Sequence, residues 1–160
     1  EFLLSQPVNP RAIVWGKYIS ATLALFLIQS LPLMGLAWLS RIGGVDLGHL
    51  GAGLFGLLLL SGALVALGLF LSSLTDSPLT ALLVTWPLFI LLWTAGFAQA
   101  GVGAFSEEGW ARIVGLFDLQ GRMSGFTQGV INFEDMVFLI AFALFWVFMT
   151  RRSLEAQGWK

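Results

Sequence analysis

The chain has no cysteine and only one histidine, His49, among its 160 residues. These shortages exclude disulfide bonds, thiolate metal sites and cysteine nucleophiles, and they leave too few ligands for a zinc or haem site. Charge is also scarce, because Asp, Glu, Lys and Arg make up 11% of the residues and the net charge is -1. Such a chain has no basic field that would attract nucleic acid.

Apolar residues, in contrast, are abundant. They make up 58% of the chain, whereas a soluble domain usually has about 45–50%. A helix needs about 20 mostly apolar residues to cross the hydrocarbon core of a bilayer. The segments that meet this length are Tyr18–Leu39, Leu50–Leu71, Leu79–Ala98 and Phe133–Thr150. We therefore predict an all-α polytopic membrane protein, with four transmembrane helices in one transmembrane domain over residues 1–160.

Charges between the predicted spans are unequally distributed. One side of the membrane would hold both chain ends and the Ser72–Ser77 turn, and its cationic residues are Arg11, Lys17, Arg151, Arg152 and Lys160. Because cytoplasmic loops have an excess of Lys and Arg, this side is predicted to be cytoplasmic. Residues 1–17 would then be a cytoplasmic segment that leads into the first span, and residues 151–160 a cytoplasmic tail.

The segment 99–132 lies outside in this topology. Its apolar residues recur at loosely helical spacing after Trp110. Two interpretations stay open: a pair of short interfacial or re-entrant helices, or a helical loop packed on the spans.

Local signals predict where helices begin. Asn9-Pro10 pairs an N-cap residue with proline at the first helical position, so a short helix should start there and lead into the first span. Asp76-Ser77-Pro78 repeats this logic before the third span. Pro32 and Pro87 lie inside spans, where each removes a backbone donor and should kink its helix.

Gly51-Ala-Gly53-Leu-Phe-Gly56 matches the dinucleotide-binding fingerprint in its letters only. That fingerprint requires a preceding strand and a βαβ unit, whereas this segment opens an apolar span. Its glycines, with Gly62 and Gly68, are instead predicted to let neighbouring helices approach closely through small-x-x-x-small pairs.

Polar side chains are few within the spans, and the span cores contain no Asp, Glu, Lys, Arg or His. The candidate pathway residues among them are Thr22, Gln29, Ser30, Thr85 and Thr94. They could line a transport path, but hydrogen bonding between helices is the favoured interpretation. His49, at the edge of the second span, is predicted to be structural or solvated, because a metal site needs partner ligands.

Three motifs follow one another along the chain. They are Leu3-Leu-Ser-Gln-Pro-Val8 with Ile13-Val-Trp-Gly-Lys-Tyr18, then Gly68-Leu-Phe-Leu-Ser-Ser-Leu-Thr75, then Phe126-Thr-Gln-Gly-Val-Ile131 with the stretch from Arg152 to Trp159. Together they resemble the permease subunits of type-2 ABC transporters, close to the gliding-motility and nitrous-oxide-reductase-maturation group. The chain departs from that pattern at Arg122-Met123, where the family often has His-Phe, and at Gln157-Gly158, where it often has a basic residue.

The resemblance implies an exporter in a bacterial inner membrane. Such permeases have six spans, and this chain, which begins at Glu1 without methionine, would hold the last four. Two permease subunits, as a homodimer or a heterodimer, form the pathway, while separate cytosolic ATPase subunits bind ATP and Mg. The chain itself has no Gly-x-x-x-x-Gly-Lys-Ser/Thr motif, so it would be a transport subunit and not an enzyme.

An ATPase must grip a structured element that is rigidly joined to a span. The Asn9–Lys17 helix is the first candidate for this role and the Ser72–Ser77 turn is the second. The candidate coupling residues are Asn9, Pro10, Arg11, Trp15, Lys17, Ser73, Thr75 and Asp76. For Asp76, helix capping is the simpler explanation.

Three other classes of protein compete with this interpretation. An ion-coupled secondary transporter usually has ionisable residues or broken helices within the membrane, which the uncharged spans argue against. An intramembrane enzyme would need a nucleophile, a base or metal ligands there. A scaffold subunit of a larger membrane complex is compatible with the sequence.

Overall fold

The computed structural model describes residues 10–43, 46–102 and 118–157. Within these ranges the protein is all-helical and contains no strand. The helices are α1 (Pro10–Gly43), α2 (Leu47–Ser73), α3 (Pro78–Val102), α5 (Leu119–Thr127) and α6 (Phe133–Gln157). The predicted all-α class is confirmed for this part of the chain.

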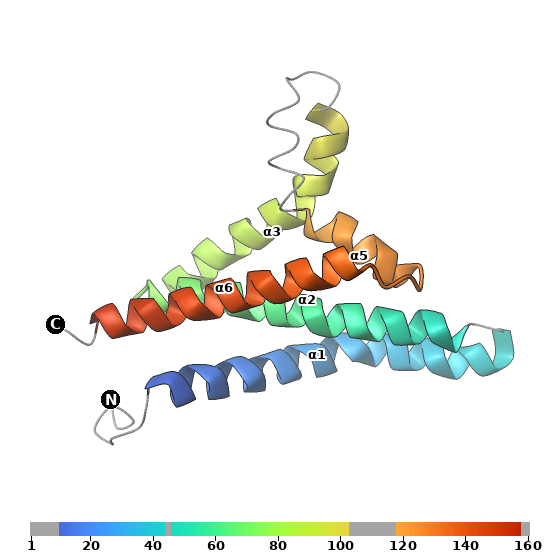
Figure 1. Ribbon diagram of the computed structural model, residues 1–160, viewed down its shortest axis with the longest axis horizontal. Coiled ribbons are helices and arrows are strands. Elements are labelled where there is room, and N and C mark those ends of the chain that lie inside the picture. Colours follow the sequence, from blue (N-terminus) through green and yellow to red (C-terminus); the bar gives the residue numbers. More distant parts are fainter. Residues whose placement is uncertain (1–9, 44–45, 103–117, 158–160) are drawn as a thin grey trace.

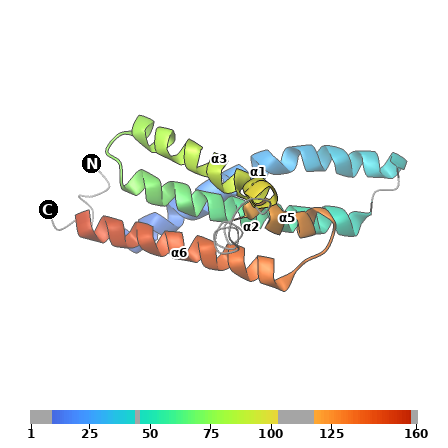
Figure 2. The ribbon, with the colours of Figure 1, turned by 90° about the horizontal axis from the view of Figure 1, so that it is seen from above.

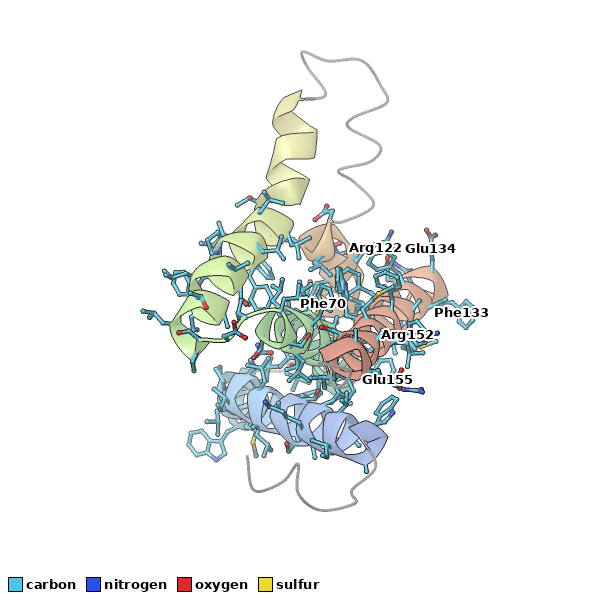
Figure 3. The ribbon with its side chains drawn as sticks, turned by 90° about the vertical axis from the view of Figure 1, so that its left-hand side faces the viewer. Phe70, Arg122, Phe133, Glu134, Arg152 and Glu155 are labelled. Carbon is cyan, nitrogen blue, oxygen red and sulfur yellow. The ribbon has the colours of Figure 1, made fainter. Side chains whose placement is uncertain are left out.

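The long helices α1, α2 and α6 run side by side, with α2 in the middle (Figures 1 and 2). In the view along the bundle, α1 and α3 lie on different sides of α2 (Figure 3). The start of α1, the turn between α2 and α3 and the end of α6 share one end of the bundle, here named the N/C end. Helix α5 and the start of α6 lie toward the other end, here named the loop end.

Within the described residues, three helices are long and apolar enough to cross a membrane, which indicates a membrane protein. These candidate spans are Ala12–Gly35, Gly48–Ser73 and Phe133–Ala156. The predicted third span corresponds to a shorter apolar helix, Pro78–Thr94, within α3. At 1.5 Å per residue its 17 residues rise about 26 Å, slightly less than a hydrocarbon core of about 30 Å.

The helices extend beyond the predicted spans at several ends. α1 begins at Pro10, as the Asn9-Pro10 signal predicts, but it continues unbroken to Gly43 instead of forming a separate short helix. α6 continues to Gln157, seven residues beyond the predicted end at Thr150. An i,i+4 pair between Arg151 and Glu155, at 2.7 Å, stabilises this last part of the helix. The first seven residues of the expected cytoplasmic tail are therefore helical.

Helix α2 contacts all the other described helices, and small residues lie at several of these contacts. Leu60, Ala63 and Leu67 of α2 are buried in the larger core cluster, which also contains Phe126 of α5 and Leu139 of α6. Ala66 belongs to a second cluster with residues of α1 and α6: Val14, Ala143 and Val147. Dispersion contacts at such small-residue surfaces hold membrane helices together, because lipid is as apolar as the helices themselves.

The predicted packing role of the α2 glycines holds at two positions. A Cβ atom at Gly56 would lie 2.5 Å from Cγ of Phe126, and one at Gly62 would lie 2.8 Å from Oη of Tyr18. Gly51 is exposed and a Cβ there would meet no atom within 4 Å, so the packing prediction is wrong at that position. A Cβ atom at Gly53 or at Gly68 would lie 4.0 Å from its nearest neighbour, which is an ordinary van der Waals distance.

Helix α5 has clear signals at both ends. The Asp118 carboxylate accepts a hydrogen bond from the Gly121 amide at 2.8 Å, which caps the start of the helix. At its end Gly129 has φ of 79°, and the Val130 and Gly129 amides donate to the carbonyls of Gly125 and Phe126. This is a Schellman stop, which favours glycine at the left-handed position. The Phe126–Ile131 motif thus ends a helix and turns the chain toward α6.

Candidate functional site

The residues predicted to couple to an ATPase lie at the N/C end of the bundle (Figure 1). Asn9 falls outside the described residues. Pro10 and Arg11 form the first turn of α1, where the structure describes the backbone alone. The side chains of Trp15 and Lys17 are exposed. Helix α1 therefore offers an exposed surface at this end for a partner to contact.

The same part of α1 is firmly packed on its inner face. Val14 is 5% exposed and lies in the cluster with Ala66 of α2 and Val147 of α6. One turn later Tyr18 packs over Gly62 and makes an edge contact with Trp15, at 5.7 Å between the ring centroids. The start of α1 is thus joined to both neighbouring helices.

The other predicted coupling residues surround the turn between α2 and α3. The hydroxyls of Ser73 and Thr75 donate back to carbonyls of α2, at 2.7 Å to Phe70 and 3.4 Å to Leu71. Asp76 is exposed. The backbone carbonyl of Ser77, not that of Asp76, accepts the first helical bond of α3, from the Ala81 amide at 3.1 Å. The turn is short, structured and accessible.

A second candidate site is a cavity of about 360 Å³ between α1, α2 and α5. Its lining combines apolar with uncharged polar side chains and one imidazole: Gln29, Leu33, His49, Leu50, Gly53, Leu57, Met123 and Thr127. Gln29 is the polar side chain that α1 contributes to the lining. The cavity lies in the half of the bundle toward the loop end.

A hydrogen bond between helices holds Gln29. The hydroxyl of Ser61, which is fully buried on α2, lies 3.0 Å from Oε1 of Gln29 and 2.7 Å from the Leu57 carbonyl. A hydroxyl has one proton to donate, so these two acceptors share it. The Gln29 amide therefore keeps hydrogen-bonding capacity that a bound molecule could use.

The five polar residues predicted within the spans do not meet at one place. Gln29 lines the cavity, whereas the Ser30 hydroxyl donates to the Leu27 carbonyl at 2.9 Å. Thr22 lies beside Gly62 of α2. On α3, Thr94 lines an open apolar groove on the outer side of that helix and Thr85 is half-buried. Because α2 separates α1 from α3 (Figure 3), the five residues cannot line a single path within one chain.

An ionic contact at the loop end was not foreseen from the sequence. Nη1 of Arg122 in α5 donates to Oδ1 of Asp135 in α6 at 3.2 Å, and the side chains are only 15% and 17% exposed. The Arg122 guanidinium also lies 3.8 Å from the ring centroid of Phe138. The Asn132 amide donates to the second Asp135 oxygen at 3.2 Å. This cluster fastens α5 to the start of α6 (Figure 3).

Replacing Arg122 with glutamine should lower the free energy of unfolding by about 2 kcal/mol, because it leaves a largely buried carboxylate without its charged partner. The measurement is thermal unfolding of the purified protein in detergent. Asp135→Asn in the Arg122→Gln background should recover part of the loss, since it removes the unpaired charge. The matched control is Glu134→Gln beside it, an exposed acid whose loss should cost close to zero. Equal losses for Arg122→Gln and Glu134→Gln would contradict the assignment.

The residues that the sequence analysis missed are mostly those that complete contacts between helices. Ser61, His49, Met123 and Thr127 surround Gln29, and only their proximity in the fold reveals this. His49 also lies against Gly129, where a Cβ atom would approach its Nδ1 to 2.7 Å. Within the described ranges no group of three or more His, Cys, Asp or Glu side chains could hold a metal ion.

Comparison with known proteins gives no relative from which a function could be inferred. No family model matches the chain, and the searches of curated proteins and of solved structures found no match. The fold and the residues define the class: an all-helical protein with candidate membrane spans. Any more particular assignment depends on the chain's own geometry.

Proposed function

We propose that this chain is the membrane-spanning permease subunit of a type-2 ATP-binding cassette transporter and exports its substrate with energy from a separate cytosolic ATPase. One observation carries the proposal: the segment predicted to couple to an ATPase is continuous with the long helix α1. The Pro10–Lys17 stretch and the apolar part of α1 belong to one helix of 34 residues. A continuous helix can transmit a displacement of its first turns to its apolar part, because no flexible joint lies between them.

The packing of α1 supports this mechanical role. Its exposed Trp15 and Lys17 offer a partner a surface, while Val14 on the inner face contacts α2 and α6. The contact on α2 is made of small side chains, which allow small sliding movements between helices. Movement of α1 against α2 would change the Gln29–Ser61 contact and the cavity beside it.

In the proposed topology α3 also crosses the membrane, as the third of four spans in this chain, and the N/C end is cytoplasmic. The strongly apolar part of α3, Pro78–Thr94, rises about 26 Å and would cross most of the hydrocarbon core, while the end of the helix turns away from the bundle (Figure 1). Lys17, Arg151 and Arg152 lie at the N/C end, as the positive-inside rule requires. The protein would be one of two permease subunits in a bacterial inner membrane.

The cavity beside Gln29 is the proposed start of the transport path. Among the described residues, its lining has an amide, an imidazole and a hydroxyl among apolar side chains and no carboxylate, ammonium or guanidinium group. Such a lining suits a substrate with an apolar body and an uncharged polar part. Parts of the three motifs that resemble type-2 permeases fall within the described residues, at the start of α1, the end of α2 and the stop of α5.

The proposal is tested by purifying the full-length protein in mild detergent from its native host and identifying what accompanies it. We expect a cytosolic ATPase that contains the Gly-x-x-x-x-Gly-Lys-Ser/Thr motif, together with a second permease subunit that is either another copy of this chain or a different protein. Exchange of Lys17 and Asp76 for residues of opposite charge should reduce the amount of ATPase recovered several-fold. Recovery of the intact protein without any ATPase would refute the assignment and favour a non-ABC transporter or a scaffold subunit.

A further inference from the structure

A groove at the N/C end has a composition unlike that of the Gln29 cavity. It has a volume of about 300 Å³ and lies between the start of α1 and the end of α6. Apolar and aromatic side chains form most of its lining, and a guanidinium closes one end: Val14, Trp15, Leu144, Val147, Phe148 and Arg151. Neither the cavity nor the coupling surface accounts for this combination.

The groove runs along α6 toward the end of the helix. Leu144, Phe148 and Arg151 follow one another at spacings of four and three residues, so they share one face of α6. From Leu144 to Arg151 that face is about 10 Å long. Val14 and Val147, each 5% exposed, form the floor. An elongated apolar slot thus ends at a cationic group.

A second cationic side chain lies beside the end of the groove that Arg151 occupies. Cζ of Arg152 lies 5.5 Å from the ring centroid of Phe148, so a second guanidinium stands at the groove wall. The negative charge of Glu155 partly offsets these cations, because its carboxylate accepts a hydrogen bond from Nε of Arg151 at 2.7 Å. In Figure 3, Arg152 and Glu155 are seen at the near end of α6.

The walls of the groove have the character of a membrane interface. Trp15 on α1 and Phe148 on α6 are 43% and 48% exposed, although they lie near the ends of their apolar helices. Tryptophan is enriched at the level of lipid headgroups, where its ring is apolar and its N–H is polar. An apolar slot that opens at this level beside two arginines matches an acyl chain joined to an anionic phosphate.

We propose that this groove binds one anionic phospholipid, with an acyl chain against Val14, Leu144 and Val147 and the headgroup phosphate at Arg151 and Arg152. Basic pockets between membrane helices recognise anionic headgroups in this way. A guanidinium is suited to phosphate because its planar set of N–H donors matches the phosphate oxygens. A bound lipid would fill the space between α1 and α6 and join them at the end where α1 begins. The inference needs only that these helices lie in a bilayer, so it does not depend on the assignment to ABC transporters.

The test is native mass spectrometry of the full-length protein in detergent, with dioleoyl phosphatidylglycerol or dioleoyl phosphatidylcholine as the added probe. We expect retained phosphatidylglycerol with a stoichiometry of one per chain and little retained phosphatidylcholine. Arg151→Gln should weaken phosphatidylglycerol retention about fivefold and Arg151→Gln with Arg152→Gln about 25-fold, since each cation near a headgroup contributes a similar factor. Arg41→Gln, toward the other end of α1, is the matched control and should change nothing.

A second variant separates the acyl-chain slot from the charges. Leu144→Trp fills the slot and should abolish retention, whereas Leu27→Trp, on the outward face of α1 with Leu27 62% exposed, should leave it unchanged. Equal retention of the two lipids, displacement of the lipid by millimolar inorganic phosphate, or unchanged retention in the double arginine variant would each overturn the proposal. Folding of every variant is checked by its elution volume in size-exclusion chromatography.

Discussion

Replacing Gly16 with proline is expected to abolish ATP-driven transport while leaving a folded, membrane-inserted protein. Gly16 lies in the exposed start of α1, and a Cβ atom there would meet no other atom within 4 Å. A side chain at this position therefore has space beside the neighbouring helices, and proline is expected to act on the backbone of α1 alone. It removes the amide that bonds to the Ala12 carbonyl and costs the helix about 3 kcal/mol. The rigid connection between the start of α1 and its apolar part would be lost.

The matched control is Gly16→Ala, which keeps the helix continuous and stabilises it by up to about 1 kcal/mol. Substrate transport and ATP hydrolysis are measured in proteoliposomes that contain the permease and its ATPase. Gly16→Pro should reduce transport at least tenfold while the ATPase still binds, and Gly16→Ala should transport normally. Normal transport by Gly16→Pro would show that force does not enter through α1, and the proposed route of coupling would then be wrong.

Phe126→Ala should destabilise the protein by about 3–5 kcal/mol, the largest loss expected from one side chain. Phe126 is completely buried, and its ring packs directly on the bare backbone of Gly56. It also lies 6.4 Å from the ring of Phe55, between centroids. Removing the ring opens a cavity between α2 and α5 that the surrounding helices cannot fully close. Helix α5, which holds Met123 and Thr127 at the Gln29 cavity, should detach first.

The opposite change at the same contact gives a second measurement. Gly56→Ala places a methyl group where the Phe126 ring lies and should cost about 1–3 kcal/mol. In the double variant the methyl group enters the space that the ring has left, so the combined loss should be smaller than the sum by about 1–3 kcal/mol. Unfolding in detergent is followed by circular dichroism against increasing concentrations of sodium dodecyl sulfate. Gly51→Ala, on the exposed face of the same helix, is the control; additive losses at Gly56 and Phe126 would contradict the contact.

Hydropathy predicted the positions of the long helices well but not their ends. The apolar run Phe133–Thr150 marks where a bilayer would surround the chain, and α6 includes all of it. A helix, however, ends where its backbone loses partners or meets a stop signal. Because Arg151 and Glu155 pair along the helix, α6 continues beyond its apolar part. The same distinction explains why α1 is one helix and not a short helix followed by a span.

The candidate sites were less predictable because their contacts connect distant parts of the chain. Gln29 and Ser61 are separated by 32 positions, and Arg122 and Asp135 by 13. Helical spacing relates residues three or four positions apart, so it gives no indication of either pairing. Ser61 is one small residue in a run of leucines, and nothing in that run distinguishes it. The small-x-x-x-small pattern did predict Gly56 and Gly62, because close approach depends on size alone and needs no knowledge of the partner.

The hydrogen bond between Gln29 and Ser61 also has a consequence for how the protein enters the bilayer. During synthesis α1 leaves the ribosome before α2, with a glutamine amide in the middle of its apolar stretch. Only residues 44–46 separate α1 from α2, so the partner hydroxyl arrives with the very next helix. A polar amide surrounded by hydrocarbon is unfavourable until it finds a hydrogen-bonding partner. Helices α1 and α2 can therefore pass from the insertion machinery into lipid as a paired hairpin, in which the Ser61 hydroxyl already bonds to the Gln29 amide.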